Sequence, residues 1–291
     1  MPHTRRELQL PSAQVSYLEW MPSTAPRRTV VLLHGASVDC AQLAWGHLGP
    51  ELAAAGHRVL APDLPGFGES PSSAWTATQA NLVACVAQFI DELELVDVTV
   101  GGISMGGGIS LGYGLQYPER IHGLVIASSA GIAERVVDGA FSLPIQILTR
   151  LLIRAGQLDV GARWKRQDRQ HLARSLTAVL RRPGSVTDEV LDLVSREVRL
   201  GHGSAANDQW QRSETLWNRA RTVYTGDFPG FEKPVLILHG SEDTGVPVAA
   251  AERAARALPE SVLVVAEGAG HWVTRDAPDA VLAALLQFLD R

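Results

Sequence analysis

Six short apolar runs limit the possible folds of this 291-residue chain more than any other feature. Each is rich in valine, leucine or isoleucine, and they cover residues 29–33, 58–61, 96–100, 124–127, 234–238 and 261–265. Stretches of helical length separate the first four runs, at residues 43–55, 76–93 and 109–117. Strands that are apolar on both faces and alternate with helices are typical of a parallel sheet covered on both sides. The helical connections between parallel strands cross the sheet in a right-handed sense, so we predict a doubly wound, mostly parallel α/β sheet.

This alternation stops between residues 132 and 230. The stretch contains only helical patterns, at residues 143–155, 171–180 and 188–200. Its charge also differs from that of the rest of the chain. The stretch has 15 Arg or Lys and 11 Asp or Glu, a net charge of +4. Since the whole chain carries −5, the remaining residues carry −9. Strand-like runs resume after it, and a last amphipathic helix is expected at 277–289. We therefore predict an α/β core of residues 1–131 and 231–291, interrupted by a helical cap at 132–230.

Composition excludes several classes of protein. With 46% hydrophobic and 20% charged residues the chain has an ordinary globular balance, and a net charge of −5 gives no basic surface for nucleic acid. The two cysteines, Cys40 and Cys85, have no metal-ligand spacing and favour a reducing cytoplasm. No apolar stretch reaches the ~20 residues of a membrane span, and no signal-like segment follows Met1. We expect a cytoplasmic protein with a small-molecule substrate and with neither a nucleic-acid nor a membrane partner.

The segment Gly102–Gly106, with the sequence G-I-S-M-G, carries the strongest local signal of chemistry. It follows a strand-like run and opens a helical stretch. A serine on such a turn exposes its Oγ on a strained backbone, and the flanking glycines avoid collisions of a Cβ with the neighbouring elements. The alternative is a glycine-rich turn that binds phosphate, but no lysine follows the glycines as in a P-loop. Ser104 is therefore the candidate nucleophile.

A serine hydroxyl needs a base to take its proton, and the base needs an acid to orient it. Asp243 follows the apolar run at 234–238, and His271 follows the run at 261–265. The carboxyl ends of parallel strands meet at one edge of a sheet, so these residues are expected near Ser104. We predict that Ser104 is the nucleophile, His271 the general base and then acid, and Asp243 the residue that fixes the His271 tautomer.

Strand–turn–helix context and the order Ser, Asp, His resemble the α/β-hydrolase superfamily. Two further segments resemble motifs of that superfamily: H-G-A-S at residues 34–37, after an early strand, and D-L-P-G-F-G-E-S at residues 63–70. The resemblance runs from about Val30 to the C-terminus and puts residues 132–230 in the position of the cap, or lid, domain. It implies that Asp63 is structural rather than catalytic.

An acyl-transfer site also needs two preorganised N–H donors for the oxyanion. The residue after the nucleophile, Met105, is expected to supply one. By resemblance to the family, Ala36 in the turn at 34–37 supplies the other. Other polar side chains near the strand ends are predicted to be structural rather than catalytic: His34, His122, His239 and Glu242.

A serine at the elbow departs from dehalogenases and epoxide hydrolases, which place Asp there. We therefore expect a serine hydrolase that cleaves a carboxylic ester or lactone of a small hydrophobic substrate through an acyl-enzyme on Ser104. Three alternatives stay open: a carbon–carbon bond hydrolase, although these commonly carry Asn where this chain has Ile103, a cofactor-free perhydrolase, and a non-catalytic small-molecule binder of the same fold. No Cys/His cluster or H-E-x-x-H motif predicts a metal, and no cofactor is expected.

The cap is expected to cover the pocket and to set substrate preference. We predict substrate contacts from two aromatic residues of the cap, Phe141 and Trp217, and from Trp272 next to His271. The resulting hypothesis is that the pocket prefers an apolar acyl or alcohol group.

Overall fold

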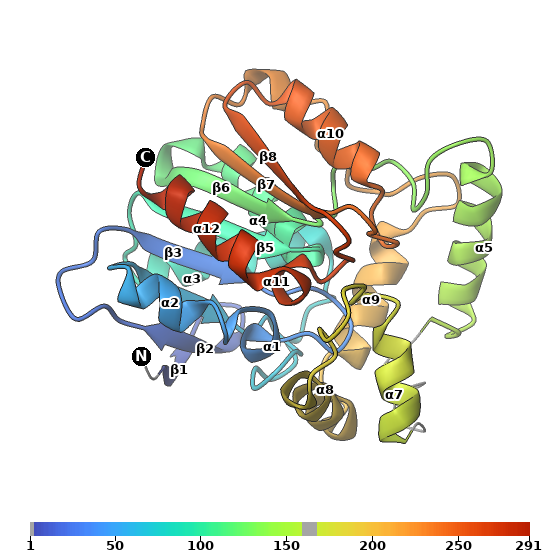
Figure 1. Ribbon diagram of the computed structural model, residues 1–291, viewed down its shortest axis with the longest axis horizontal. Coiled ribbons are helices and arrows are strands. Elements are labelled where there is room, and N and C mark those ends of the chain that lie inside the picture. Colours follow the sequence, from blue (N-terminus) through green and yellow to red (C-terminus); the bar gives the residue numbers. More distant parts are fainter. Residues whose placement is uncertain (1–2, 159–167) are drawn as a thin grey trace.

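The computed structural model describes residues 3–158 and 168–291 (Figure 1). Its strands form one sheet in the order β1-β2-β4-β3-β5-β6-β7-β8. The strands are β1 (Thr4–Gln9), β2 (Gln14–Trp20), β3 (Thr29–Leu33), β4 (Arg58–Pro62), β5 (Val98–Ile103), β6 (Ile121–Ala127), β7 (Val235–Gly240) and β8 (Ser261–Ala266). From β4 across to β8 all neighbours pair in parallel, whereas β1 pairs with β2 and β2 with β4 in antiparallel fashion. The predicted doubly wound, mostly parallel sheet is confirmed.

Strands β1 and β2 are not among the six runs that the sequence predicts. β1 is an edge strand whose residues are nearly all exposed, so it has no apolar run to recognise. β2 is buried, but its apolar pattern is broken by Ser16 and Glu19. The buried Glu19 carboxylate pairs with Arg6 and Arg58. These ion pairs explain how a charged residue fits into a buried strand.

Helices cover both faces of the sheet. They are α1 (Ala41–Trp45), α2 (Gly49–Ala54), α3 (Gln79–Glu92), α4 (Met105–Gln116), α10 (Val248–Ala257), α11 (Val273–Asp276) and α12 (Pro278–Leu289), with 3-10 turns η1 (Pro118–Arg120) and η2 (Phe228–Gly230). Alternate strand residues divide the core: Val31 packs toward α3, α4 and α10, and its neighbour Leu32 packs toward α1, α2, α11 and α12. Each such buried side chain stabilises the fold by about 1.5–3 kcal/mol. None of the helices in the described parts of the chain is long and apolar enough to span a membrane.

Between β6 and β7 the chain leaves the sheet. Here the described residues form α5 (Ser142–Arg154), α7 (Arg169–Leu176), α8 (Asp188–Leu200) and α9 (Ser204–Glu214), and no strand. Figure 1 shows these helices beyond one end of the sheet, with α5 farthest from it. The helical character predicted for this insertion is therefore seen in its described part. Its boundaries at residues 132 and 230, and its separation as a domain, stay a prediction.

Candidate active site

Ser104 occupies a strained turn between β5 and α4. Its φ of 54° and ψ of −116° are unusual for a residue other than glycine. The turn is fixed on both sides, because Ser104 N–H donates to the Ala127 carbonyl and Ala130 N–H donates to the Ser104 carbonyl, both at 2.9 Å. A Cβ on Gly106 would lie 2.4 Å from the His34 carbonyl oxygen, so only glycine fits there. This packing holds a conformation that costs about 1–3 kcal/mol.

The structure brings Ser104, His271 and Asp243 together. His271 Nε2 lies 3.0 Å from Ser104 Oγ, and His271 Nδ1 lies 2.9 and 3.0 Å from the two Asp243 oxygens. Asp243 stands in the loop after β7 and His271 in the loop after β8, as the strand order predicts. Gly245 leaves room for the ring, because a Cβ there would lie 2.8 Å from His271 Nδ1. These distances are those needed for a nucleophile, a base and an orienting acid.

The Asp243 carboxylate is buried and has many donors around it. The N–H groups of Gly245 and Val246 donate to Oδ1 at 2.7 and 3.0 Å. Burial by itself raises the pKa of Asp243, but the hydrogen bond and charge of His271, with help from Val246, outweigh it and lower that pKa. Asp243 is therefore held as the carboxylate, ready to stabilise a protonated His271.

His239 is a second histidine at the same carboxylate, a contact that no motif in the sequence indicates. Its buried Nε2 lies 3.0 Å from the Val246 carbonyl and 3.3 Å from Asp243 Oδ2. Burial lowers the pKa of His239, so the ring is neutral and Nε2–H is the donor to Val246. The residue is buried, as predicted, and it packs against the buried Asp243 carboxylate. No group of three or more His, Cys, Asp or Glu in the described chain is arranged to hold a metal ion.

The turn predicted to complete the oxyanion hole passes beside the nucleophile. A Cβ on Gly35 would lie 3.4 Å from Ser104 Cβ. Gly35 N–H is already used, since it donates to Asp39 Oδ2 at 2.7 Å, whereas no acceptor for Ala36 N–H is found among the described residues. Met105 is the first residue of α4, where N–H groups have no acceptor within the helix. The oxyanion-hole roles of Ala36 and Met105 stay a prediction with this support.

Two buried side chains hold that turn in place. His34 Nδ1–H donates to the Gly35 carbonyl at 2.7 Å, and His34 Nε2 accepts from Leu64 N–H at 2.9 Å. Asp39 accepts from Gly35 and, at 2.9 Å, from Cys40 N–H. His34 thus supports the turn as predicted. Asp39 was missed, and the only signal for it is an acidic residue five positions after His34 in an otherwise apolar segment.

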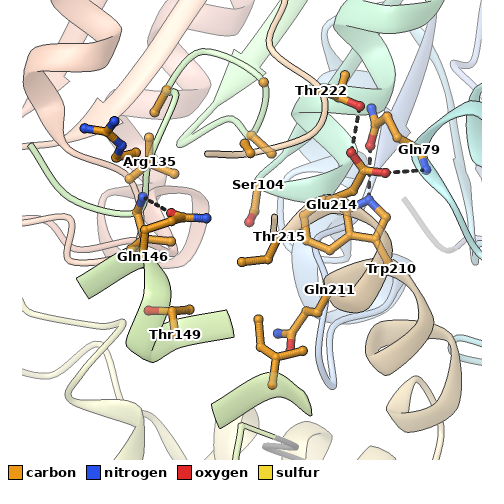
Figure 2. A pocket seen from close by; sticks show the side chains of 18 of the residues that line it. Gln79, Ser104, Arg135, Gln146, Thr149, Trp210, Gln211, Glu214, Thr215 and Thr222 are labelled. Carbon is orange, nitrogen blue, oxygen red and sulfur yellow. Dashed lines mark hydrogen bonds between the residues drawn. The ribbon is translucent and has the colours of Figure 1, made fainter. Parts of the chain in front are cut away.

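A cavity of about 280 Å³ lies between Ser104, His271 and the insertion. Figure 2 shows Arg135, Gln146 and Thr149 on one side of Ser104, and Gln79, Trp210 and Glu214 on the other. Glu214 is buried and accepts from Thr222 Oγ1 at 2.6 Å, and Trp210 Nε1–H donates to Gln79 Oε1 at 3.1 Å. Polar groups therefore interrupt the apolar lining, and the predicted preference for an apolar acyl or alcohol group stays a prediction.

None of the three aromatic residues predicted as substrate contacts lines this cavity. Phe141 is 75% exposed, at the start of α5, which turns Gln146, Thr149 and Ile153 toward the cavity. Trp217, in the segment after α9, is 48% exposed. The Trp272 side chain is buried in the core cluster, and its backbone N–H donates to the Val179 carbonyl at 3.1 Å. Adjacency to His271 in sequence did not bring the Trp272 side chain into the pocket.

Comparisons with known proteins agree with this geometry. A family model described as the alpha/beta hydrolase fold matches residues 28–278. The chain is 29% identical over 248 residues to the 2-hydroxy-6-oxo-2,4-heptadienoate hydrolase of Pseudomonas putida, covering 84% of this chain and 82% of that protein. It is 27% identical over 276 residues to the 2-hydroxy-6-oxononadienedioate/2-hydroxy-6-oxononatrienedioate hydrolase of Escherichia coli K12, covering 90% and 87%.

A solved structure of a thermophilic esterase from Thermogutta terrifontis has a TM-score of 0.74 at 22% identity, covering 99% of this chain and 98% of that one. A likeness at this identity concerns the fold alone. The family model, in contrast, spans most of the sequence, including the elbow and both partners of Ser104. The protein therefore belongs to the alpha/beta hydrolase fold family.

Proposed function

We propose that this hydrolase cleaves a carbon–carbon bond in a small 2-hydroxy-6-oxo-dienoate, with Ser104 as its nucleophile. The observation that carries the proposal is the hydrogen-bonded set of Ser104, His271 and Asp243 at the cavity. The two relatives named for such dienoates, at 27–29% identity over more than four fifths of the chain, supply the substrate class. The proposal thus adopts an alternative to the ester or lactone expected first from the sequence.

The chemistry of that substrate class explains why the bond must be a carbon–carbon bond. A 2-hydroxy-6-oxo-dienoate has a ketone, an enol and a carboxylate, but neither an ester nor a lactone. Hydrolysis must therefore add water across the bond between C5 and the ketone carbon C6. C6 gains the hydroxyl and leaves as a carboxylic acid, and C5 gains a hydrogen and stays with the 2-hydroxydienoate.

Each residue of the site has one part in this reaction. His271 takes the proton of Ser104 as Oγ bonds to C6, and the N–H groups of Ala36 and Met105 stabilise the oxyanion. This attack takes place on the 2-oxo tautomer, in which the enol proton has moved from the C2 hydroxyl to C5 and made that carbon sp3. The C5–C6 bond then breaks, its electron pair is delocalised through C3=C4 onto O2, and the dienolate oxygen takes the proton held by His271. Water activated by His271 hydrolyses the acyl group from Ser104. Asp243 stabilises the protonated His271 in both halves.

The cavity has groups that suit an enol and a carboxylate. Thr149 and Gln211 come from facing helices, and Arg135 adds a cation on the Thr149 side (Figure 2). A volume of about 280 Å³ restricts the substrate to a small molecule.

Carboxylic ester hydrolysis is the second candidate, and one observation favours it. Ile103 is fully buried at the end of β5, where carbon–carbon hydrolases commonly carry Asn next to the serine. The same nucleophile, base and oxyanion donors serve an ester, whose alcohol is an easier leaving group than carbon. The two activities therefore differ in the leaving group and in the polar contacts it needs.

A direct comparison of two substrates tests the proposal. The purified protein is given 2-hydroxy-6-oxohepta-2,4-dienoate, and loss of the dienolate absorbance is followed with detection of acetate by NMR. The reference is p-nitrophenyl acetate, with Ser104→Ala as the blank for both. We expect kcat/KM for the dienoate to exceed that for the ester at least tenfold. Dienoate turnover at the Ser104→Ala level, with the ester still cleaved, would instead assign the protein to ester hydrolysis.

A further inference from the structure

Exposed apolar side chains gather on one helix of the insertion. Phe141 and Leu151 are 75% and 50% exposed, and Trp217, half exposed, lies beside the same helix. We call the group the α5 patch, and it consists of Phe141, Leu143, Ile147, Leu148, Leu151 and Trp217. The residues 143, 147 and 151 are four apart and share one side of the helix. Isolated exposed apolar residues are ordinary, but a contiguous group of this kind marks an interaction site.

Helix α5 has most of its apolar side chains on its solvent-exposed side, whereas an ordinary surface helix has them on its buried side. Two of its three buried residues, Ser142 and Gln146, are polar and the third is Ile153, whereas Thr149 lines the cavity with Gln146 and Ile153. The leucines and isoleucine at 147, 148 and 151 face solvent. A helix that packs only on its own protein puts its apolar side inward. The outward side of α5 is therefore left without cover by the described residues of this chain.

The charge around the α5 patch is positive. Within α5 the charged residues are Arg150 and Arg154, with no acidic residue. Arg150 donates to the Arg212 carbonyl at 2.5 Å and its guanidinium lies 5.9 Å from the centre of the Trp217 ring, which puts these cations beside the patch. Arg212 pairs with Asp208, and Arg221 donates to the Ser213 carbonyl, whereas no acidic partner of Arg154 or Arg221 is found among the described residues. The whole stretch 132–230 carries +4 and the rest of the chain −9.

We propose that the α5 patch docks the protein on an anionic lipid surface. Leucine, phenylalanine and tryptophan beside arginines is the composition of helices that lie in the boundary between headgroups and acyl chains. Arg154 and Arg221 then meet lipid phosphates, and the −9 remainder is kept away from the surface by its own charge. A second copy of this chain is the less favourable occupant, because a symmetric contact sets two basic patches against each other.

This inference replaces the expectation of no membrane partner, which concerned spans and signals, and it does not depend on the proposed reaction. It does bring the cavity close to the lipid, because the inner side of the same helix contributes Gln146, Thr149 and Ile153 to the cavity wall. Phe141 and Trp217, expected to contact substrate, are here assigned to the outer surface.

Vesicle flotation of the full-length protein tests the docking surface. The probes are vesicles of equal parts phosphatidylglycerol and phosphatidylcholine, with pure phosphatidylcholine for comparison, at low and high salt. We expect flotation with the anionic vesicles at low salt and its loss at high salt. The double variant Leu148→Gln/Leu151→Gln should bind at least tenfold more weakly, and Arg154→Gln about fivefold more weakly. The matched control is Leu200→Gln, which removes a leucine 54% exposed on α8, outside the patch, and should bind as the wild type.

Three results would overturn the proposal. The first is no flotation of the wild type with anionic vesicles. The second is a loss of vesicle binding in the Leu200→Gln control as large as in the Leu148→Gln/Leu151→Gln variant, which would mean that the protein adsorbs nonspecifically. The third is a wild type that sediments as a dimer without lipid, while the Leu148→Gln/Leu151→Gln variant sediments as a monomer. That result would assign the patch to contact with a second copy of the chain. Circular dichroism and thermal melting of each variant establish that it is folded.

Discussion

At the residue scale, the contact between Ser104 and His271 means that neither side chain acts alone. Without His271 the Ser104 hydroxyl keeps its proton, and without Ser104 the base has nothing to activate. We expect Ser104→Ala and His271→Ala each to be folded and to reduce hydrolysis to near background. The double variant should lose little more. Losses that multiply in the double variant, measured as kcat/KM on the same substrate, would contradict the shared role.

Asp39 allows a second prediction at this scale. Its two oxygens accept from the N–H groups of Gly35 and Cys40, and an asparagine can satisfy only one of them. Because Gly35 lies against Ser104, Asp39→Asn should misplace the Ala36 N–H and lower kcat about 10- to 100-fold, with KM changed less than about threefold. Asp138→Asn, which alters an exposed pair with Arg253, is the control and should leave kcat unchanged. An unaltered kcat in Asp39→Asn would show that the turn does not need this carboxylate.

At the scale of the helices, α5 and α9 form facing walls of the cavity. Thr149 on α5 and Gln211 on α9 line it, and neither side chain has a hydrogen-bond partner among the described residues. We expect Thr149→Val and Gln211→Leu each to raise KM for a hydroxylated dienoate about 2- to 10-fold, the range for one lost hydrogen bond. The rate on p-nitrophenyl acetate should stay within about twofold. Phe141→Ala, outside the cavity, should change neither the KM for the dienoate nor the rate on p-nitrophenyl acetate. A changed KM in this variant would mean that Phe141 does contact the substrate.

The same helices show where prediction from sequence reaches its limit. Five of the six predicted strands, β3 to β7, lie inside the sheet and were predictable because burial on both faces leaves an apolar run. The sixth, β8, is an edge strand that is partly buried and still apolar. The exposed edge strand β1 leaves no such trace. For α5, the rule that apolar sides face inward gives the wrong orientation, so Phe141 was placed in the pocket and Gln146 was not. A helix whose exposed side is apolar cannot be oriented from its own periodicity.

At the scale of the whole molecule, the strand order explains why three residues far apart in sequence meet at one point. Ser104, Asp243 and His271 follow β5, β7 and β8, whose carboxyl ends share one edge of the sheet. This part of the site was predictable because topology alone places it. The cavity was not, because its size and polarity depend on how side chains of the insertion pack above that edge.

Global stability should fall in acid, and His47 is expected to contribute. Its Nε2–H donates to the Thr274 carbonyl at 2.7 Å, which links the α1–α2 segment to α11. Burial, with a smaller effect of Arg275, lowers the pKa of His47 from 6.5 to about 4. The unfolded chain therefore binds a proton between these two pH values that the folded protein does not. Stability from this group is complete above about pH 6.5 and is lost progressively toward pH 4, by about 1.4 kcal/mol per pH unit.

His47→Gln isolates that contribution, because a glutamine amide can still donate to Thr274 but takes up no proton. Free energies of unfolding from urea titrations between about pH 7 and pH 4 should fall less steeply in the variant, by about 3 kcal/mol over the whole interval. His57 and His239, whose pKa values are also lowered by burial, keep part of the acid dependence in both proteins. If the free energies of unfolding of wild type and variant fall equally with pH, His47 takes up its proton in the folded state near its ordinary pKa. Solvent would then have to reach the ring between α1 and α11.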